Sequence, residues 1–184
     1  MVGRNVKSIF LLSAVLFCVA SCGYHFSGEG QGPKPGLRCI AIPVFTNMTT
    51  EPNAGAKFAG ALRNEFIQKG TMQVVSVEDA EAVFIGTISG IRIQPVAHLP
   101  VTQVSDRVTV VNRLIVTLNI RCEDKKTHKI LWQDAAFSYH KTYQVEDNAL
   151  QPNPITGFEN REAALDVLAQ EMSVRIHDRF LSNF

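Results

Sequence analysis

The sequence has almost no excess of charge of either sign. Lysine and arginine number 18 against 17 aspartate and glutamate residues in the 184-residue chain. Removing Arg4 and Lys7, which lie within the first seven residues, leaves 16 basic residues against the 17 acidic ones. A surface for general nucleic-acid binding would appear as a basic patch or stripe. The composition therefore excludes nucleic acid as the expected partner.

Recognisable catalytic motifs are missing from the sequence as well. No HExxH, GxSxG or P-loop pattern occurs, and the histidines are scattered without metal-ligand spacing. The five histidines are His25, His98, His128, His140 and His177. The charged pairs Asp124 with Lys125 and Glu159 with Arg161 are most simply solvated charges of a turn and of a helix start. We therefore predict a protein that is not an enzyme and that needs no metal or cofactor.

A long hydrophobic run occurs only near the N-terminus, at residues 9–20. A helix needs about 20 apolar residues to span a bilayer, so this run is too short to do so. It follows the basic residues Arg4 and Lys7 and ends in small residues before Cys22, which is the pattern of a signal peptide for export. The alternatives are an uncleaved anchor and a signal that is cut by the ordinary peptidase.

A cysteine directly after small residues resembles the lipobox of bacterial lipoproteins. The resemblance implies a signal peptide over residues 1–21, cleavage before Cys22, a diacylglycerol on its sulfur and a further acyl chain on its new amino group. One acyl chain holds a protein only marginally, whereas two or more anchor it stably. In lipoproteins an aspartate after the cysteine commonly retains the protein at the inner membrane, and here Gly23 follows. The resemblance therefore implies a lipid anchor at the periplasmic side of the outer membrane.

Apart from Cys22, the exported chain keeps only two cysteines, Cys39 and Cys122. An exported location permits disulfides, so a disulfide between Cys39 and Cys122 is one alternative. The alternation of residues places Cys122 on the core face of its strand and leaves Cys39 off that face. This pattern favours two separate small hydrophobic residues over a disulfide.

The rest of the chain reads as a linker followed by a single folded domain. Residues 22–36 are rich in glycine and proline, which is typical of a flexible spacer, and residues 37–184 are long enough for one core. Hydrophobic periodicity predicts strands over residues 37–45, 72–77, 82–96, 107–122 and 129–145, and helices over residues 54–69 and 160–182. Asn53 is the expected N-cap of the first helix, and Gly70 is its expected C-terminal stop.

The order of these elements predicts an α+β fold. We expect a two-layer sandwich in which a mainly antiparallel sheet of four to five strands carries two amphipathic helices on one face. In a regular strand Trp132 and Phe137 would lie on opposite faces of the sheet, so we expect a bulge near residues 133–135 that places both on the same face. A second apolar line on the last helix has two interpretations, partial burial under a loop or contact with a partner. That line consists of Ala163, Val167, Val174 and Leu181.

If both helices cover one side of the sheet, its other face has no cover from this chain. On that face we place Val111, Arg113, Ile115 and Thr117, together with Ile91 and Ile93. Branched apolar residues mixed with arginine suit an amphipathic ligand or the wall of a protein partner. An ordinary half-exposed sheet face, which also tolerates scattered apolar residues, is the alternative.

Four short motifs occur in order along the chain. They are CGYHF at residues 22–26, IAIPVFTN at residues 40–47, GTI at residues 86–88 and KILWQD at residues 129–134. With an amphipathic helix after the second motif and another after the last, the chain resembles the LPS-assembly lipoprotein family, LptE. The resemblance implies an outer-membrane lipoprotein that plugs the lumen of the LPS-assembly barrel, LptD, in a one-to-one complex. It also implies help with folding of that barrel and with delivery of lipopolysaccharide to the outer leaflet.

Within this resemblance, Cys22 is the one residue whose role carries over directly. For contact with lipopolysaccharide the family implies basic residues near the tips of strand-connecting loops. Here Arg107 is the first cation after the apolar connection of residues 95–106, so we expect Arg107 and Arg113 to meet a lipid A phosphate. The loop residues expected to contact the partner are Val96, Leu99, Pro100 and Val101. An ordinary hairpin loop with a surface arginine is the alternative.

Two other classes of partner-binding protein share the strand-helix-strand order and the IPVFTN stretch of residues 42–47. They are periplasmic lipoproteins that activate peptidoglycan synthases and lipoprotein subunits of secretion pores. A lipid-modifying hydrolase would require a nucleophile–histidine pair, which the sequence does not reveal. The barrel-binding lipoprotein is therefore the first interpretation, and a synthase activator or pore subunit is the alternative.

Overall fold

The structure is a computed structural model that describes residues 32–99, 107–148 and 154–182. The elements in these ranges are β1 (Cys39–Ala41), β2 (Thr46–Asn47), α2 (Ala54–Lys69), β3 (Gln73–Val74), β4 (Ala82–Leu99), β5 (Arg107–Asp124), β6 (Ile130–Asn148) and α3 (Pro154–Ser182). The predicted signal peptide and the predicted lipid-bearing Cys22 lie outside the described residues. None of the helices in these ranges has the length and apolar character needed to span a membrane.

The sheet is mixed, because its short strands run parallel to β4 while its long strands are antiparallel. Its order is β3-β1-β4-β5-β6. β2 also pairs with β4, at residues that follow those paired with β1. β1 is parallel to both β3 and β4, and β2 is parallel to β4. The prediction of a mainly antiparallel sheet with four to five strands is therefore corrected to six strands. The physical reason is the helical crossover through α2, which returns the chain parallel to β1.

The structure has two short strands near the one predicted over residues 37–45: β1 ends at Ala41, and β2 begins at Thr46, just beyond the predicted range. Pro43 lies between the two pieces and has no N–H to donate to a ladder. Phe45 follows it, and its N–H donates to the carbonyl of Gly55 instead of to a neighbouring strand. A proline therefore ends one strand and lets the chain turn toward α2.

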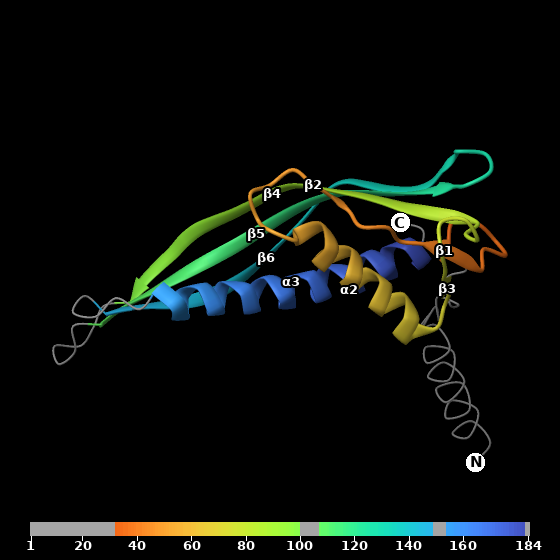
Figure 1. Cartoon of the computed structure of the whole chain (residues 1–184). Coiled ribbons are helices and arrows are strands. Elements are labelled where there is room, and N and C mark those ends of the chain that lie inside the picture. The colour runs from red at the N-terminus through yellow and green to blue at the C-terminus, as the bar shows by residue number, and fades with distance from the viewer. Residues whose placement is uncertain (1–31, 100–106, 149–153, 183–184) are drawn as a thin grey trace, which may run out of the picture. The chain divides into compact units, whose positions relative to one another are not determined.

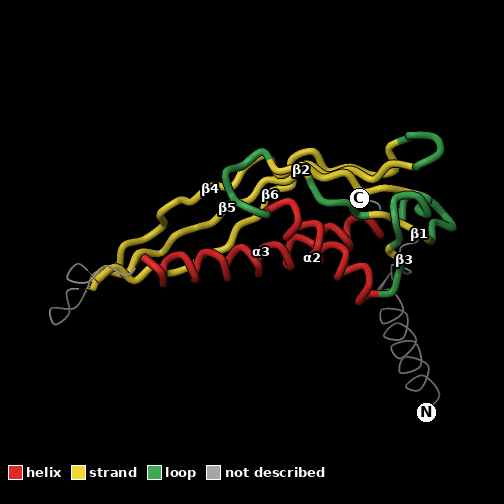
Figure 2. Tube along the Cα trace, in the orientation of Figure 1, coloured by secondary structure: helices red, strands yellow, loops and turns green. Residues whose placement is uncertain are grey.

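Both helices lie on one face of the sheet, as predicted. Figure 1 shows α2 and α3 side by side beneath β4, β5 and β6, and Figure 2 shows the same layering of helices against strands. The core-facing residues of β5 are fully buried under them, and these are Leu114, Val116, Leu118, Ile120 and Cys122. At the centre of the core, the ring of Phe180 lies 4.9 Å from that of Phe84 and 5.9 Å from that of Trp132. Edge-to-face pairs of this kind add to the stabilisation that burial provides.

The ends of α2 agree with the sequence only in part. Gly70 follows the helix with a φ of 63°, and its N–H donates to the carbonyl of Phe66, which confirms the predicted C-terminal stop. Asn53 precedes the helix in the left-handed conformation, and its side chain makes no capping hydrogen bond within the described residues. Its carbonyl accepts the N–H of Lys57. Asn53 therefore occupies the N-cap position without the side-chain cap that we predicted.

Bulges in β4 and β6 decide which residues face the helices. In β6 the register shifts between Phe137 and Asp134, which confirms the predicted bulge. In β4 an extra residue at Ser89 shifts the register, so that Ile91 pairs with Val116 and Ile93 with Leu114. Directly opposed residues share a face of the sheet, so these two isoleucines lie on the helix side. Their prediction for the uncovered face was wrong because one inserted residue reverses the parity of a strand.

The cysteines do not form a disulfide. Cys39 is half-buried and Cys122 is buried, and both thiols are free. β4 lies between the strands that carry them, and two strand spacings amount to about 10 Å. A disulfide requires α-carbons within about 7 Å. The structure therefore supports two separate small hydrophobic residues.

Candidate binding surfaces

The predicted partner loop lies at the end of the hairpin formed by β4 and β5. β4 continues to Leu99, so Val96 and Leu99 belong to a strand and not to the loop in which we placed them. The Val96 residue is 46% exposed. Pro100 and Val101 lie outside the described residues, as do the side chains of Leu99 and Arg107. The contacts predicted for this region stay predictions.

Arg113 lies in the middle of β5, six residues after Arg107. At about 3.4 Å per residue their α-carbons are roughly 20 Å apart, so the structure does not bring the two predicted arginines together. Across the sheet Arg113 is paired with Gln94 in β4 and Thr142 in β6. Its Nε is buried and has no hydrogen-bond partner within the described residues. This N–H is a donor that an incoming acceptor could use.

The uncovered face of the sheet carries the four residues of β5 that we placed there. They are Val111, Arg113, Ile115 and Thr117, which alternate with the buried residues of the strand and are themselves half-buried. On the same face, Ile115 has Arg92 of β4 on one side and His140 of β6 on the other. Apolar and cationic or titratable side chains are thus neighbours on this face. Such a surface fits an amphipathic ligand better than a purely apolar one.

A shallow hollow of about 540 Å³ lies at the edge of this face. Met48 and the two threonines after it form one side, and the β4 bulge with Arg92 forms the other. The hollow exists because β2 pairs with β4 at Thr87 and Ile88, just before the bulge. No sequence pattern indicates this hollow, because a two-residue strand has no detectable periodicity.

Among the residues that the structure describes, no group of three or more histidine, cysteine or acidic side chains is placed to hold a metal ion. His177 is buried, with Nε2 3.1 Å from Oγ1 of Thr71 and Nδ1 3.1 Å from Oδ1 of Asp178. Its ring also packs edge-on against Phe66, with 4.9 Å between the ring centroids. These contacts join the end of α2 to α3, so they are part of the packing of the two helices.

Two groups at the end of β5 have displaced pKa values. Burial, with a smaller contribution from the nearby carboxylates of Glu123 and Asp124, raises the pKa of the Cys122 thiol to about 12. A hydrogen bond from Lys34, followed by one from the backbone of Thr127, holds the pKa of Asp124 well below its usual range. Both groups stabilise the architecture: Cys122 packs in the core, and Asp124 closes the turn before β6.

The region from just before β1 to the last turn of α3 matches one known family. The LptE family, described as lipopolysaccharide-assembly, matches residues 37–180. The chain belongs to the LptE family. At the level of that family, its role is non-enzymatic and lies in lipopolysaccharide transport and outer-membrane assembly. The match confirms the resemblance carried by the four motifs.

Solved structures similar to this LptE-family chain include several lipoproteins. A candidate lipoprotein of Caulobacter crescentus CB15 is 11% identical, with a TM-score of 0.49 over 76% of this chain and 88% of that one. The PelC dodecamer of Paraburkholderia phytofirmans is 14% identical, with a TM-score of 0.42 over 77% and 86% of the two chains. A minor lipoprotein of Acinetobacter baumannii is 11% identical, with a TM-score of 0.41 over 80% and 92%. At these values the likenesses carry no argument about function. Among curated protein sequences, none matches the chain.

Proposed function

We propose that this protein is the lipoprotein partner of the outer-membrane barrel LptD. In this role it occupies the lumen of the barrel, assists its assembly and assists the delivery of lipopolysaccharide to the outer leaflet. The observation that carries the proposal is the family match over residues 37–180, which spans nearly all of the folded part. The described part of the uncovered sheet face mixes apolar and cationic side chains, which agrees with a protein that works by contact.

The anchor in this proposal is Cys22, acylated after removal of residues 1–21. The linker of residues 22–36 then connects the lipid to a single domain over residues 37–184. Two or more acyl chains suffice to hold such a domain at a membrane surface. The domain would lie on the periplasmic side of the outer membrane, where the barrel lumen opens.

Purification of the full-length lipoprotein from outer membranes tests the partnership. We expect a large barrel to accompany it in equal amount, because a plug and its barrel form a one-to-one complex. Recovery of the lipoprotein without a barrel, or with a peptidoglycan synthase or a ring of its own copies, would contradict the proposal.

For lipopolysaccharide we propose contact through Arg107 and Arg113. The buried, unpartnered Nε of Arg113 on the uncovered face supports this choice, since guanidinium groups bind phosphates through paired hydrogen bonds. Substitution of both arginines by alanine should weaken lipopolysaccharide binding by the full-length protein. Arg38→Ala, an exposed arginine beside β1, is the control that should bind normally. Unchanged binding by the double variant would remove this face from consideration.

A further inference from the structure

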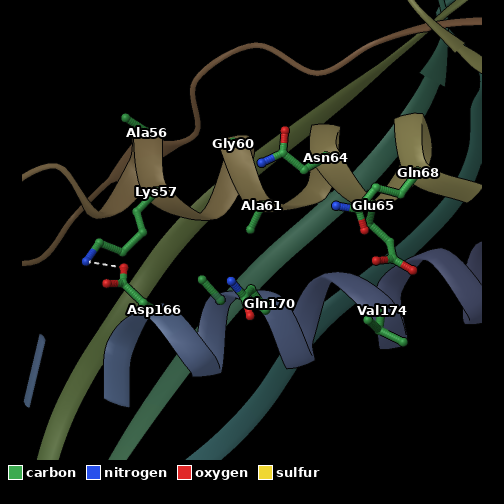
Figure 3. Close-up of a pocket in the computed structure, with 11 residues that line it drawn as sticks. Ala56, Lys57, Gly60, Ala61, Asn64, Glu65, Gln68, Asp166, Gln170 and Val174 are labelled. Atoms are coloured by element: carbon green, nitrogen blue, oxygen red, sulfur yellow. Dashed lines mark ion pairs between the residues drawn. The ribbon is translucent and has the colours of Figure 1, made fainter. Parts of the chain in front are cut away.

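A groove of about 690 Å³ runs between α2 and α3 and is lined only by residues of these two helices. Figure 3 shows side chains of both helices reaching into the space between them. Small residues contribute to its wall on both sides, namely Gly60 and Ala61 from α2 and Ala169 from α3. Small residues allow a partner to approach the helices closely. They do not by themselves say what binds.

The carboxylate of Glu65 indicates the chemistry of the missing occupant. Glu65 is only 9% exposed, and Figure 3 shows its carboxylate between the helices, turned toward α3. Its Oε1 is buried without a hydrogen-bond partner among the described residues. Nζ of Lys69 lies 3.8 Å from this oxygen, which is beyond hydrogen-bonding distance. Buried carboxylates are normally hydrogen-bonded or paired, because their desolvation is costly.

The other cation of the groove is already engaged. Nζ of Lys57 lies 2.6 Å from Oδ1 of Asp166 and 3.1 Å from Oε2 of Glu162, so it satisfies two carboxylates and is not directed to Glu65. The charges that interact at the groove are two positive, Lys57 and Lys69, against three negative, Glu65, Glu162 and Asp166. A cationic group is therefore the complementary occupant.

We propose that this groove receives a lysine or arginine side chain of a protein partner, with its cationic end on Glu65. Such a side chain combines a donor for the oxygen that lacks a hydrogen bond with an apolar stem, and Ala61, Ala169 and Val174 offer apolar surface for that stem. The inference rests on the proposed function, because the barrel would be the partner that supplies the cation. It assigns to the helix layer a contact that is separate from the uncovered face of the sheet.

Glu65→Gln tests the proposal, because it keeps the size of the side chain and removes its charge. The full-length lipoprotein is purified from outer membranes in a series of rising salt concentrations, and the ratio of barrel to lipoprotein is measured. We expect the variant to retain about tenfold less barrel, since loss of one partner of a buried charge pair weakens a complex by at least this factor. The matched control is Glu159→Gln, an exposed acid of α3 outside the groove. Barrel retention equal to that of the unmodified protein would overturn the inference.

Gly60→Leu is a second variant that does not depend on the charge. A Cβ atom at Gly60 meets only Nη2 of Arg63, at 3.9 Å, so the free chain accommodates a side chain there. That side chain fills the groove and should also displace the barrel, while the protease resistance of the anchored chain stays unchanged. Normal retention by Gly60→Leu overturns the inference even if Glu65→Gln fails to fold. If the unmodified protein itself retains no barrel, the proposed function fails instead.

Discussion

Gly86 and Gly90 lie four residues apart in β4 and differ in what surrounds them. A Cβ atom at Gly86 would lie 2.6 Å from ring carbons of Phe45, whereas at Gly90 it would meet no described atom within 4 Å. Phe45 is buried, so its ring cannot move aside freely. Gly86→Ala should therefore lower the free energy of unfolding by about 1–3 kcal/mol through overpacking. Gly90→Ala should change it by about 0.5 kcal/mol or less.

Denaturant unfolding of the two alanine variants measures this difference. The unmodified protein supplies the reference, and Gly90→Ala controls for the change in backbone freedom that both substitutions share. Equal unfolding midpoints for the two variants would show that Phe45 does not pack against Gly86.

The two thiols of the folded part should differ in reactivity. Cys39 is half-buried, while burial raises the pKa of the Cys122 thiol to about 12, and only the thiolate reacts with an alkylating reagent. Iodoacetamide at about pH 8 should modify Cys39 in the folded protein and leave Cys122 intact, and peptide mapping locates the adduct. Unfolding before treatment should expose both thiols. Recovery of a disulfide-linked peptide pair would contradict the arrangement of β1, β4 and β5.

The turn between β5 and β6 depends on one carboxylate. Asp124 accepts the N–H groups of Lys126 and Thr127, and Nζ of Lys34 donates to it at 2.6 Å. These hydrogen bonds, led by that of Lys34, lower the pKa of Asp124 in the folded chain. A carboxylate whose pKa is lowered by folding contributes its full stabilisation at pH values above the pKa that the same aspartate has in the unfolded chain, about 3.9. That stabilisation is lost as the pH falls below this value.

Asp124→Asn should therefore reduce stability at neutral pH and flatten the loss of stability below about pH 4. Unfolding followed at a series of pH values compares the variant with the unmodified protein. Lys34→Ala is the companion variant, because it removes the strongest cause of the shift while it leaves the turn N–H contacts in place. Curves that stay parallel down to acidic pH would show that Asp124 is not held as the structure has it.

The elements were predictable where one periodicity holds without interruption. Hydrophobic periodicity predicted β5, which buries alternate residues from Leu114 to Cys122, and α2, which buries Phe58, Leu62 and Phe66. The faces of Ile91 and Ile93 were not predictable, because the inserted Ser89 reverses parity without leaving a pattern in the sequence. The parallel pairing of β1 with β3 and β4, and of β2 with β4, was missed for a related reason. Strands of two or three residues are positioned by tertiary contacts and show no periodicity in the sequence.

The second apolar line of α3 keeps both of its interpretations in part. Val167 and Val174 are each 38% exposed, whereas Leu181 packs against the core. Val174 also lines the groove between the helices. The exposed half of this line is therefore available for a partner on the same side of the molecule as Glu65.

In the folded unit after Gly30, two surfaces offer binding chemistry, and they lie on different layers. The uncovered sheet face with Arg113 was predictable from the alternation in β5. The groove with Glu65 was not, because an acidic residue next to the buried Phe66 is an ordinary feature of a helix in the sequence. Only the structure shows that its buried Oε1 has no hydrogen bond within the described residues. A plug inside a barrel meets its partner on several sides at once. Two separate surfaces agree with the proposed function.

In the proposed function, the outer membrane needs this protein to assemble the barrel that delivers lipopolysaccharide. Depletion of the protein in its own organism, with measurement of mature LptD and of lipopolysaccharide at the cell surface, tests that claim most directly. We expect both quantities to fall, and we expect the unmodified gene to restore them while a Cys22→Ala copy restores them poorly. Normal amounts of mature barrel and of surface lipopolysaccharide in depleted cells would contradict it.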